Sequence, residues 1–221
     1  FTEVDEEDYY YTDRIGVEAS RQIEEFAKFD KPFFQYVAFT AAHWPIHAPE
    51  KSIRKYLKTY VGGWEKLRRE RYARMLEMGI IDKERWPLPP REDRVKPWDT
   101  IDHKPWRIRN MAIYAAMVDH MDQAVGAIVD ALEKTKQLEN TFIIYFHDNG
   151  ACPEHLGGNG WNTANNILAK AKKAGKTIAV GDKYDVPMGG PMTYGSVGHN
   201  WANAQNTPMR RYKSNVHNGG A

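Results

Sequence analysis

The chain has 221 residues, of which 42% are hydrophobic and 12% aromatic, so it is long and apolar enough to bury a core. Its seven Trp and twelve Tyr residues argue against low-complexity disorder. A formal net charge of +2 without a Lys/Arg block gives no indication of nucleic-acid binding, and no apolar run approaches the roughly 20 residues of a membrane span. One cysteine excludes an internal disulfide and assigns no compartment.

A helix and a strand are predicted first in chain order. Thr12 is the expected N-cap of a helix over about residues 13–29, whose apolar residues recur at helical spacing. Pro32 follows this helix. Residues 33–39 are aromatic and β-branched, which is typical of a buried strand, and a loop rich in His and Pro occupies residues 40–49.

A charged helical insertion is predicted over about residues 50–105. Residues 50–79 have the composition of a helix with a solvated face, and residues 83–105 hold five prolines, which favours an extended connection. A long helix is expected over about residues 106–134. Its apolar residues recur at spacings of three and four, which predicts core packing and not a cofactor site.

The second half begins with another predicted strand, over residues 140–147, and continues into a Gly/Asn-rich loop insertion over about residues 151–206 with a short helix near residues 164–174. The order strand, helix, strand predicts an α/β domain with some parallel pairing. Three aromatic residues either line a substrate pocket or anchor this insertion: Trp161, Tyr194 and Trp201.

A candidate metal site lies where the second strand ends, at Asp148-Asn149-Gly150. Ligands gather at the carboxyl ends of strands in open α/β sheets, and carboxylate and amide oxygens suit a hard cation such as Ca²⁺. Asp-Asn-Gly is also ordinary turn chemistry, so the tripeptide by itself leaves both interpretations open.

Two further clusters carry candidate functional residues. His43 and His47 follow the first strand, where histidine can donate a proton near neutral pH or, when charged, bind an anion; a structural loop role is the alternative. Lys213 offers a compact positive charge for a sulfate or phosphate oxygen, although by itself it is equally an ordinary surface lysine.

Taken together and in this order, the segments resemble the sulfatases. The resemblance covers nearly the whole chain and is carried by four ordered motifs and one stretch of the charged insertion: residues 39–49 (FTAAHWPIHAP), 114–122 (YAAMVDHMD), 147–151 (HDNGA), 206–213 (NTPMRRYK) and 63–68 (GWEKLR). The last is a feature of the bacterial arylsulfatase branch.

The resemblance implies a partial alkaline-phosphatase-like α/β/α sandwich that hydrolyses sulfate monoesters of small molecules or carbohydrates. It implies Asp148 and Asn149 as ligands of a divalent cation, usually Ca²⁺. His43 would donate to the leaving alcohol, Lys213 would bind sulfate, and His47 would contact substrate. The family's nucleophile is a formylglycine made from Cys or Ser, and a periplasmic or secreted location is expected.

Three departures from the family pattern qualify this expectation. Cys152 is followed by Pro153-Glu154, which does not match Cys/Ser-x-Pro/Ala-x-Arg, and no serine satisfies that motif. The paired aspartates of the metal site are missing, and Asn218 stands where the family has Glu. Residues 1–221 are therefore expected to be part of one catalytic domain, inactive without a preceding formylglycine segment. A phosphomonoester or phosphonate hydrolase and a non-catalytic metal- or anion-binding homologue are the alternatives.

Overall fold

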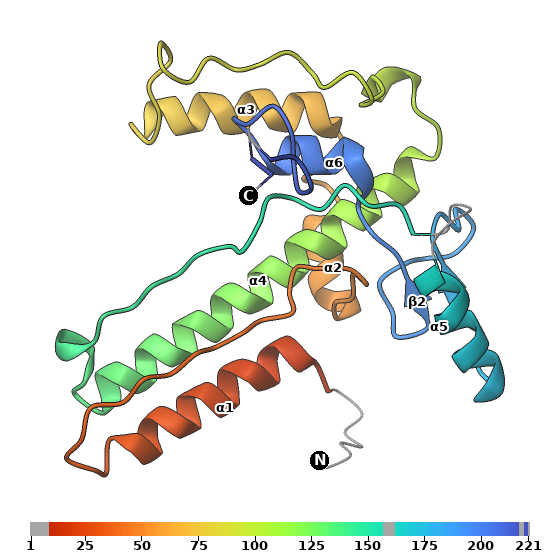
Figure 1. Cartoon of the computed structure of the whole chain (residues 1–221). Helices are drawn as coiled ribbons and strands as arrows, with labels where there is room; N and C mark the ends of the chain where they lie inside the picture. The colour runs from red at the N-terminus through yellow and green to blue at the C-terminus, as the bar shows by residue number, and fades with distance from the viewer. Residues whose placement is uncertain (1–8, 157–161, 217–218, 221) are drawn as a thin grey trace.

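The computed structural model describes residues 9–156, 162–216 and 219–220, and the side chains of residues 162–164 are not described. Figure 1 shows one helical group made of α1, α2 and α4 and a second made of α3 and α6. Within the described residues, no helix is long and apolar enough to cross a membrane. In chain order the elements are α1 (Tyr11–Phe26), α2 (Glu50–Tyr56), α3 (Gly63–Glu77), η1 (Trp98–Thr100), α4 (Lys104–Lys134), η2 (Leu138–Asn140), α5 (Asn162–Lys173), β1 (Ala179–Val180), β2 (Thr193–Tyr194) and α6 (Gly198–Gln205).

Helices α1 and α4 lie side by side along most of α1 (Figure 1). A Cβ added at Gly16 would lie 2.6 Å from the Cβ of Ala124, so glycine permits the close approach of the two helices. Further along, Ile23 is buried against Ala131 and Leu132. Because the contacting residue numbers rise together in both helices, α1 and α4 run parallel.

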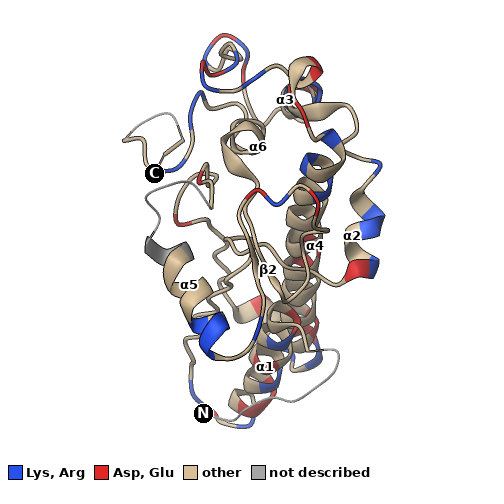
Figure 2. Ribbon diagram, turned by 90° about the vertical axis from the view of Figure 1, so that its right-hand side faces the viewer, with Lys and Arg blue, Asp and Glu red and all other residues tan. Residues whose placement is uncertain are grey.

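The predicted helices are present with different boundaries. Thr12 lies buried inside the first turn of α1, and Tyr10 occupies the N-cap position, so the predicted cap is wrong. The single helix predicted over residues 50–79 is two helices, α2 and α3, because the chain turns between them and Gly63 adopts φ +77°. Charged residues of both signs are distributed along α1, α2 and α4 (Figure 2).

A cluster of aromatic rings joins α3, η1 and α6. The ring of Trp64 meets that of Trp98 at 4.8 Å and that of Trp201 at 5.3 Å, both edge to face. Arg68 is buried beside them, and its guanidinium donates to the backbone carbonyls of Asn203 at 2.9 Å and Met209 at 3.1 Å. We call this unit the tryptophan block. Arg68 is therefore an internal anchor, contrary to the expectation that the charged residues of this insertion form a solvated face.

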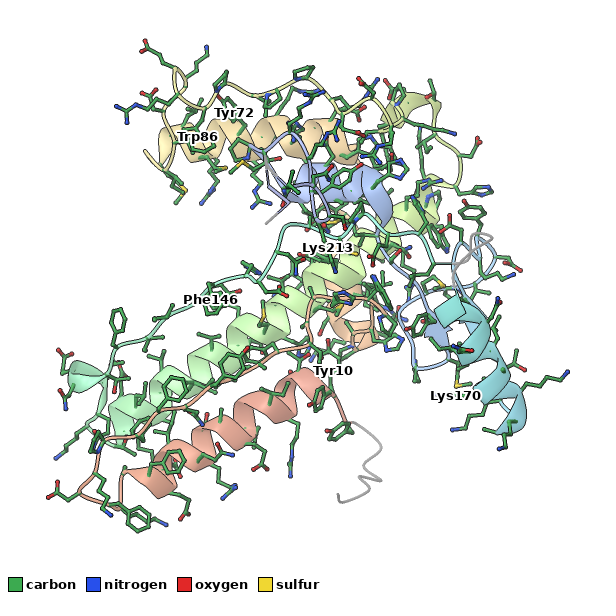
Figure 3. All side chains as sticks on the ribbon, viewed as in Figure 1. Tyr10, Tyr72, Trp86, Phe146, Lys170 and Lys213 are labelled. Atoms are coloured by element: carbon green, nitrogen blue, oxygen red, sulfur yellow. The ribbon has the colours of Figure 1, made fainter. Side chains whose placement is uncertain are left out.

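Both predicted buried strands are wrong as stated. Residues 33–39 follow an extended path beside α1 and alternate between half-buried and exposed, as a strand does, but no β-ladder includes them (Figure 1). Residues 141–147 likewise lie outside any ladder, and the side chains of Phe34 and Phe142 are 89% and 88% exposed. A strand needs a neighbour to pair with, and neither segment has one among the described residues. The label in Figure 3 marks Phe146 on the second segment.

Within the described residues, one parallel pair of strands is present, in a different place from those predicted. β1 and β2 pair through Ala179 with Thr193 and Val180 with Tyr194, inside the loop insertion. Helix α5 lies close to the predicted residues 164–174, and its last turn carries lysines that Figure 2 shows in blue, a favourable position at a helix C-terminus. Helix α6 was not predicted.

Candidate functional site

His43 and Lys213 lie in contact although 170 residues separate them. Lys213 Nζ is 3.2 Å from His43 Nε2. The other ring nitrogen, Nδ1, is 2.7 Å from the backbone carbonyl of Trp44, which can only accept a hydrogen bond. Nδ1 therefore carries the proton in the neutral ring, and Nε2 offers its lone pair to the ammonium group of Lys213.

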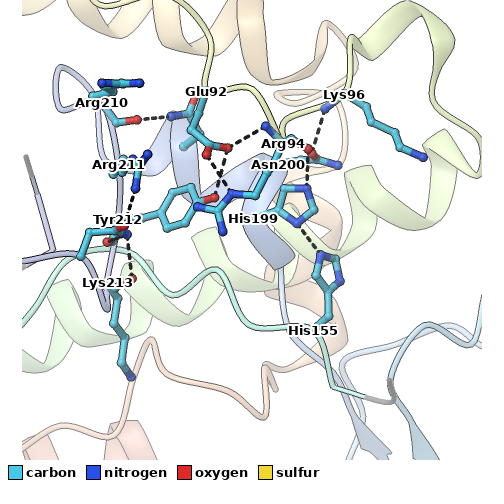
Figure 4. Close-up of polar contacts among 12 residues, drawn as sticks. Glu92, Arg94, Lys96, His155, His199, Asn200, Arg210, Arg211, Tyr212 and Lys213 are labelled. Atoms are coloured by element: carbon cyan, nitrogen blue, oxygen red, sulfur yellow. Dashed lines mark hydrogen bonds and ion pairs between the residues drawn. The ribbon is translucent and has the colours of Figure 1, made fainter. Parts of the chain in front are cut away.

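Two sets of hydrogen bonds hold Lys213 in place. Its backbone N–H donates to the carbonyl of Ala151 at 3.0 Å, which ties residues 206–213 to the loop that follows the second extended segment. The preceding residue, Tyr212, is 1% exposed and donates its hydroxyl to Glu92 at 3.3 Å. In Figure 4 the Tyr212 ring points into the polar cluster while the Lys213 side chain points away from it. Burial of Tyr212 therefore fixes the direction of Lys213.

The Glu92 carboxylate organises this cluster (Figure 4). Burial alone would raise its pKa, but hydrogen bonds from the side chain and backbone of Arg94 outweigh burial, and its pKa lies below the usual value. Burial and the nearby charge of Glu92 raise the pKa of Tyr212. Tyr212 therefore remains a neutral hydroxyl donor to an ionised Glu92 at neutral pH.

The turn at Asp148 to Gly150 lies against the segment that carries Lys213. The Asn206 side chain accepts from the backbone N–H of Ala151 at 3.0 Å and donates to the Gly219 carbonyl at 2.7 Å. Within the described part of the chain, no hydrogen bond or ion pair engages the side chains of Asp148 and Asn149. Their carboxylate and amide oxygens suit a hard divalent cation, and the two residues would supply only part of its coordination.

His47 is turned to a different partner. Its Nε2 lies 2.6 Å from the carbonyl of Thr193 in β2, and its own carbonyl accepts from the Tyr10 hydroxyl at 2.8 Å. These contacts join the histidine loop to β2 and to the start of α1. The predicted role of His47 in substrate binding stays a prediction.

Two residues beside His43 were not among the predicted site residues. The Cys152 thiol donates to Glu154 at 3.2 Å, and the indole N–H of Trp44 donates to the same carboxylate. Burial raises the pKa of the Cys152 thiol to about 11, and the Glu154 carboxylate adds to this effect. The Cys-x-Glu spacing is the sequence feature that could have indicated this pair. The nucleophile motif, which Cys152 does not match, gives no indication of it.

Two histidines of the insertion, His155 and His199, lie beside the cluster around Glu92 and Arg94 (Figure 4). His199 Nε2 lies 2.9 Å from the carbonyl of Arg94, so Nε2 is the donor and Nδ1 accepts from His155 Nε2 at 2.7 Å. Burial and the neighbouring His155 lower the pKa of His199. His155 Nδ1 faces Asp182 Oδ2 at 3.7 Å. His199 is therefore a neutral acceptor of the hydrogen bond from His155 at neutral pH.

The aromatic residues of the insertion have different environments. Trp201 is 1% exposed and belongs to the tryptophan block, so it anchors the insertion. The Tyr194 ring lies 5.9 Å from that of Trp44, edge to face, on the side of the histidine loop. Trp161, with the glycine-rich residues 157–160, lies outside the described residues.

In a comparison with known protein families, residues 2–189 match the family described as "Sulfatase". An arylsulfatase of Klebsiella aerogenes is 29% identical over 213 residues, which cover 93% of this chain and 42% of that protein. An uncharacterized sulfatase of Schizosaccharomyces pombe is 39% identical over 121 residues, 54% of this chain and 22% of its own length. An uncharacterized sulfatase of Escherichia coli, YidJ, is 27% identical over 145 residues. The chain spans less than half the length of these relatives.

Proposed function

This chain belongs to the sulfatase family, and from that premise we propose that the protein is an arylsulfatase-type sulfuric ester hydrolase. The observation that carries the proposal is the contact between His43 Nε2 and Lys213 Nζ at 3.2 Å. Both residues lie in segments that resemble sulfatase motifs, and His43 is exposed and Lys213 half-exposed, so both are accessible to a ligand. An ammonium group beside an imidazole that can take up a proton suits the singly charged sulfate monoester.

An anion between the two side chains also favours protonation of His43. In the neutral ring, Nε2 accepts a hydrogen bond from Lys213 and has no proton to donate. When a sulfuryl group takes the Lys213 ammonium as its partner, Nε2 is released. The negative charge then stabilises the imidazolium form of His43, whose Nδ1–H remains held by the Trp44 carbonyl.

Protonated His43 is suited to help the leaving alcohol. Cleavage of the S–O bond builds negative charge on the leaving oxygen, and a proton from Nε2 neutralises that charge. Lys213 keeps its charge throughout and stabilises the sulfuryl oxygens. His43 is thus the proposed general acid, and Lys213 the proposed sulfate ligand.

Asp148 and Asn149 would hold a divalent cation, with Ca²⁺ favoured by their oxygen donors. When bound, such a cation polarises the sulfuryl oxygens. Cys152 does not suit the role of formylglycine precursor or free nucleophile, because its thiol is half-buried with a pKa raised to about 11 and its sequence context departs from the motif. We therefore place the nucleophile, and the remaining strands of an α/β/α sandwich, outside these 221 residues.

The test measures kcat/KM of the full-length protein across sulfate esters whose leaving alcohols have graded pKa values. His43→Ala is expected to lose about 10²–10⁴-fold with poor leaving groups and much less with nitrophenyl sulfates. Lys213→Ala should lose activity evenly across the series, because the sulfuryl group is common to every substrate.

His47→Ala is the matched control, since it removes a neighbouring histidine of the same loop. It should show no dependence on the leaving group. An equal loss across the series for His43→Ala would contradict the general-acid role. Phosphate monoesters cleaved faster than sulfate esters would instead favour a phosphohydrolase. The 221-residue chain alone should leave aryl sulfates intact.

A further inference from the structure

His43 also belongs to a group of three potential metal ligands of different chemistry. One ring nitrogen of His43, the sulfur of Cys152 and one carboxylate oxygen of Glu154 all lie within 4.8 Å of one another. Zn²⁺ bonds of about 2.0–2.3 Å in tetrahedral geometry place ligand atoms about 3.3–3.8 Å apart, so the side chains need to close by only about 1 Å. A nitrogen, sulfur and oxygen set favours Zn²⁺ over Ca²⁺, which takes oxygen ligands.

Trp44 already orients two of these three ligands. Its backbone carbonyl accepts from His43 Nδ1 at 2.7 Å, which leaves Nε2 as the coordinating nitrogen. Its indole N–H donates to the Glu154 carboxylate and fixes that group's direction. Metal-binding histidines commonly donate their second ring N–H to a backbone carbonyl or carboxylate, and metal-binding carboxylates are commonly hydrogen-bonded as well. The arrangement around Trp44 is therefore that of a second coordination shell.

We propose that His43, Cys152 and Glu154 bind Zn²⁺, and that Zn²⁺ at this site blocks the sulfate esterase reaction. The blocking arm rests on the proposed function, because it depends on His43 serving the leaving oxygen. His43 Nε2 has one lone pair, so it cannot coordinate a metal and carry the catalytic proton together. The site is distinct from the oxygen ligands Asp148 and Asn149.

The charges and protons of this binding step balance. The Cys152 thiol releases its proton to solvent, and its hydrogen bond to Glu154 is replaced by coordination of both groups to the metal. Thiolate and carboxylate together neutralise the dication. Lys213 gives up its hydrogen bond to His43 Nε2 and turns to solvent. Because the bound thiol must ionise, the apparent affinity should rise about tenfold per pH unit in the range where the free thiol is protonated.

Direct binding to the full-length protein tests the site without any activity measurement. Equilibrium dialysis gives the affinity for Zn²⁺, and Co²⁺ substitution gives an absorption band that arises only from a thiolate bound to the metal. Cys152→Ser should abolish the band and weaken Zn²⁺ binding at least about 10–100-fold, and Glu154→Gln should weaken it similarly. The matched control is Glu77→Gln, at an exposed carboxylate in α3, which should change neither. A thiolate band that survives in Cys152→Ser, or Zn²⁺ affinity equal in all variants, overturns the proposed site.

Inhibition of sulfate ester hydrolysis tests the blocking arm. Zn²⁺ should inhibit the unmodified protein in competition with substrate, and Cys152→Ser should keep its activity while becoming at least about 10-fold less sensitive. Zn²⁺ binding that depends on Cys152 but does not inhibit hydrolysis would contradict the use of His43 by both the metal and the reaction. That result would leave the sulfatase proposal intact. If the protein cleaves no sulfate ester, the proposed function fails, while the cobalt band still decides the metal site.

Discussion

The tryptophan block and the two extended segments differ in where their partners lie. In the tryptophan block, the rings of Trp64, Trp98 and Trp201 contact one another, and the Arg68 guanidinium finds carbonyl acceptors in α6 and beyond. Residues 33–39 and 141–147 are equally rich in aromatic residues, yet many of these are exposed. Apolar composition therefore indicates the capacity for burial, and only an adjacent surface turns that capacity into a core.

The histidine loop (residues 40–49) and the Lys213 segment (residues 206–213) are intermediate between the buried tryptophan block and the exposed extended segments. Contacts between residues far apart in the sequence hold each in place: His47 with Thr193 for the loop, and Tyr212 with Glu92 for the Lys213 segment. The candidate site is thus supported by β2 of the insertion and by Glu92. Three pairs of substitutions test how far this contrast between regions holds.

The largest effect is expected for Trp201→Ala. The side chain is 1% exposed and also donates its indole N–H to the Arg107 carbonyl, so its removal leaves a cavity and deletes this hydrogen bond. We expect a loss of about 3–5 kcal/mol in the free energy of unfolding, measured by urea denaturation. Phe142→Ala, at an 88% exposed ring, should change it by no more than about 0.5 kcal/mol. A loss from Phe142→Ala as large as that from Trp201→Ala would show that other residues of the protein cover the segment.

Arg68→Met should lower the free energy of unfolding by about 1.5–3 kcal/mol. Methionine keeps most of the apolar stem but leaves the Asn203 and Met209 carbonyls without their donor. Arg69→Met changes the next residue of α3, which is exposed, and should be nearly neutral in the same denaturation experiment. Equal stability of the two variants would mean that Arg68 is a surface residue in effect and not an anchor.

The smallest effects of the three concern the α1–α4 contact and have opposite signs. Gly16→Ala places a methyl group 2.6 Å from Ala124 Cβ, and the overpacked contact should cost about 1–3 kcal/mol. Gly126→Ala, in α4 with open space around it, should stabilise the helix by about 0.5–1 kcal/mol. Thermal unfolding of both variants gives the comparison. Stabilisation by Gly16→Ala would contradict the close parallel packing of the two helices.

Helix positions were largely predictable because their evidence is local. The spacing of apolar residues located α1 and α4 to within a few residues, since a helix satisfies its own backbone hydrogen bonds, and the short helix predicted near residues 164–174 is α5. The division between α2 and α3 was missed because the turn there lacks a proline and depends on Gly63. The strands were misplaced for the opposite reason, because a ladder is a contact between distant segments.

The candidate site shows the same division. By itself, the sequence determined which residue types were available: the histidine loop, the Asp-Asn-Gly turn and the Lys213 segment, whose order also indicated the sulfatase family. Only the tertiary structure decided that Lys213 contacts His43, that His47 binds β2, and that Cys152 and Glu154 lie within reach of His43. The sequence of each segment specifies which side chains it carries. The distance between side chains 170 positions apart depends instead on how the intervening helices and loops pack.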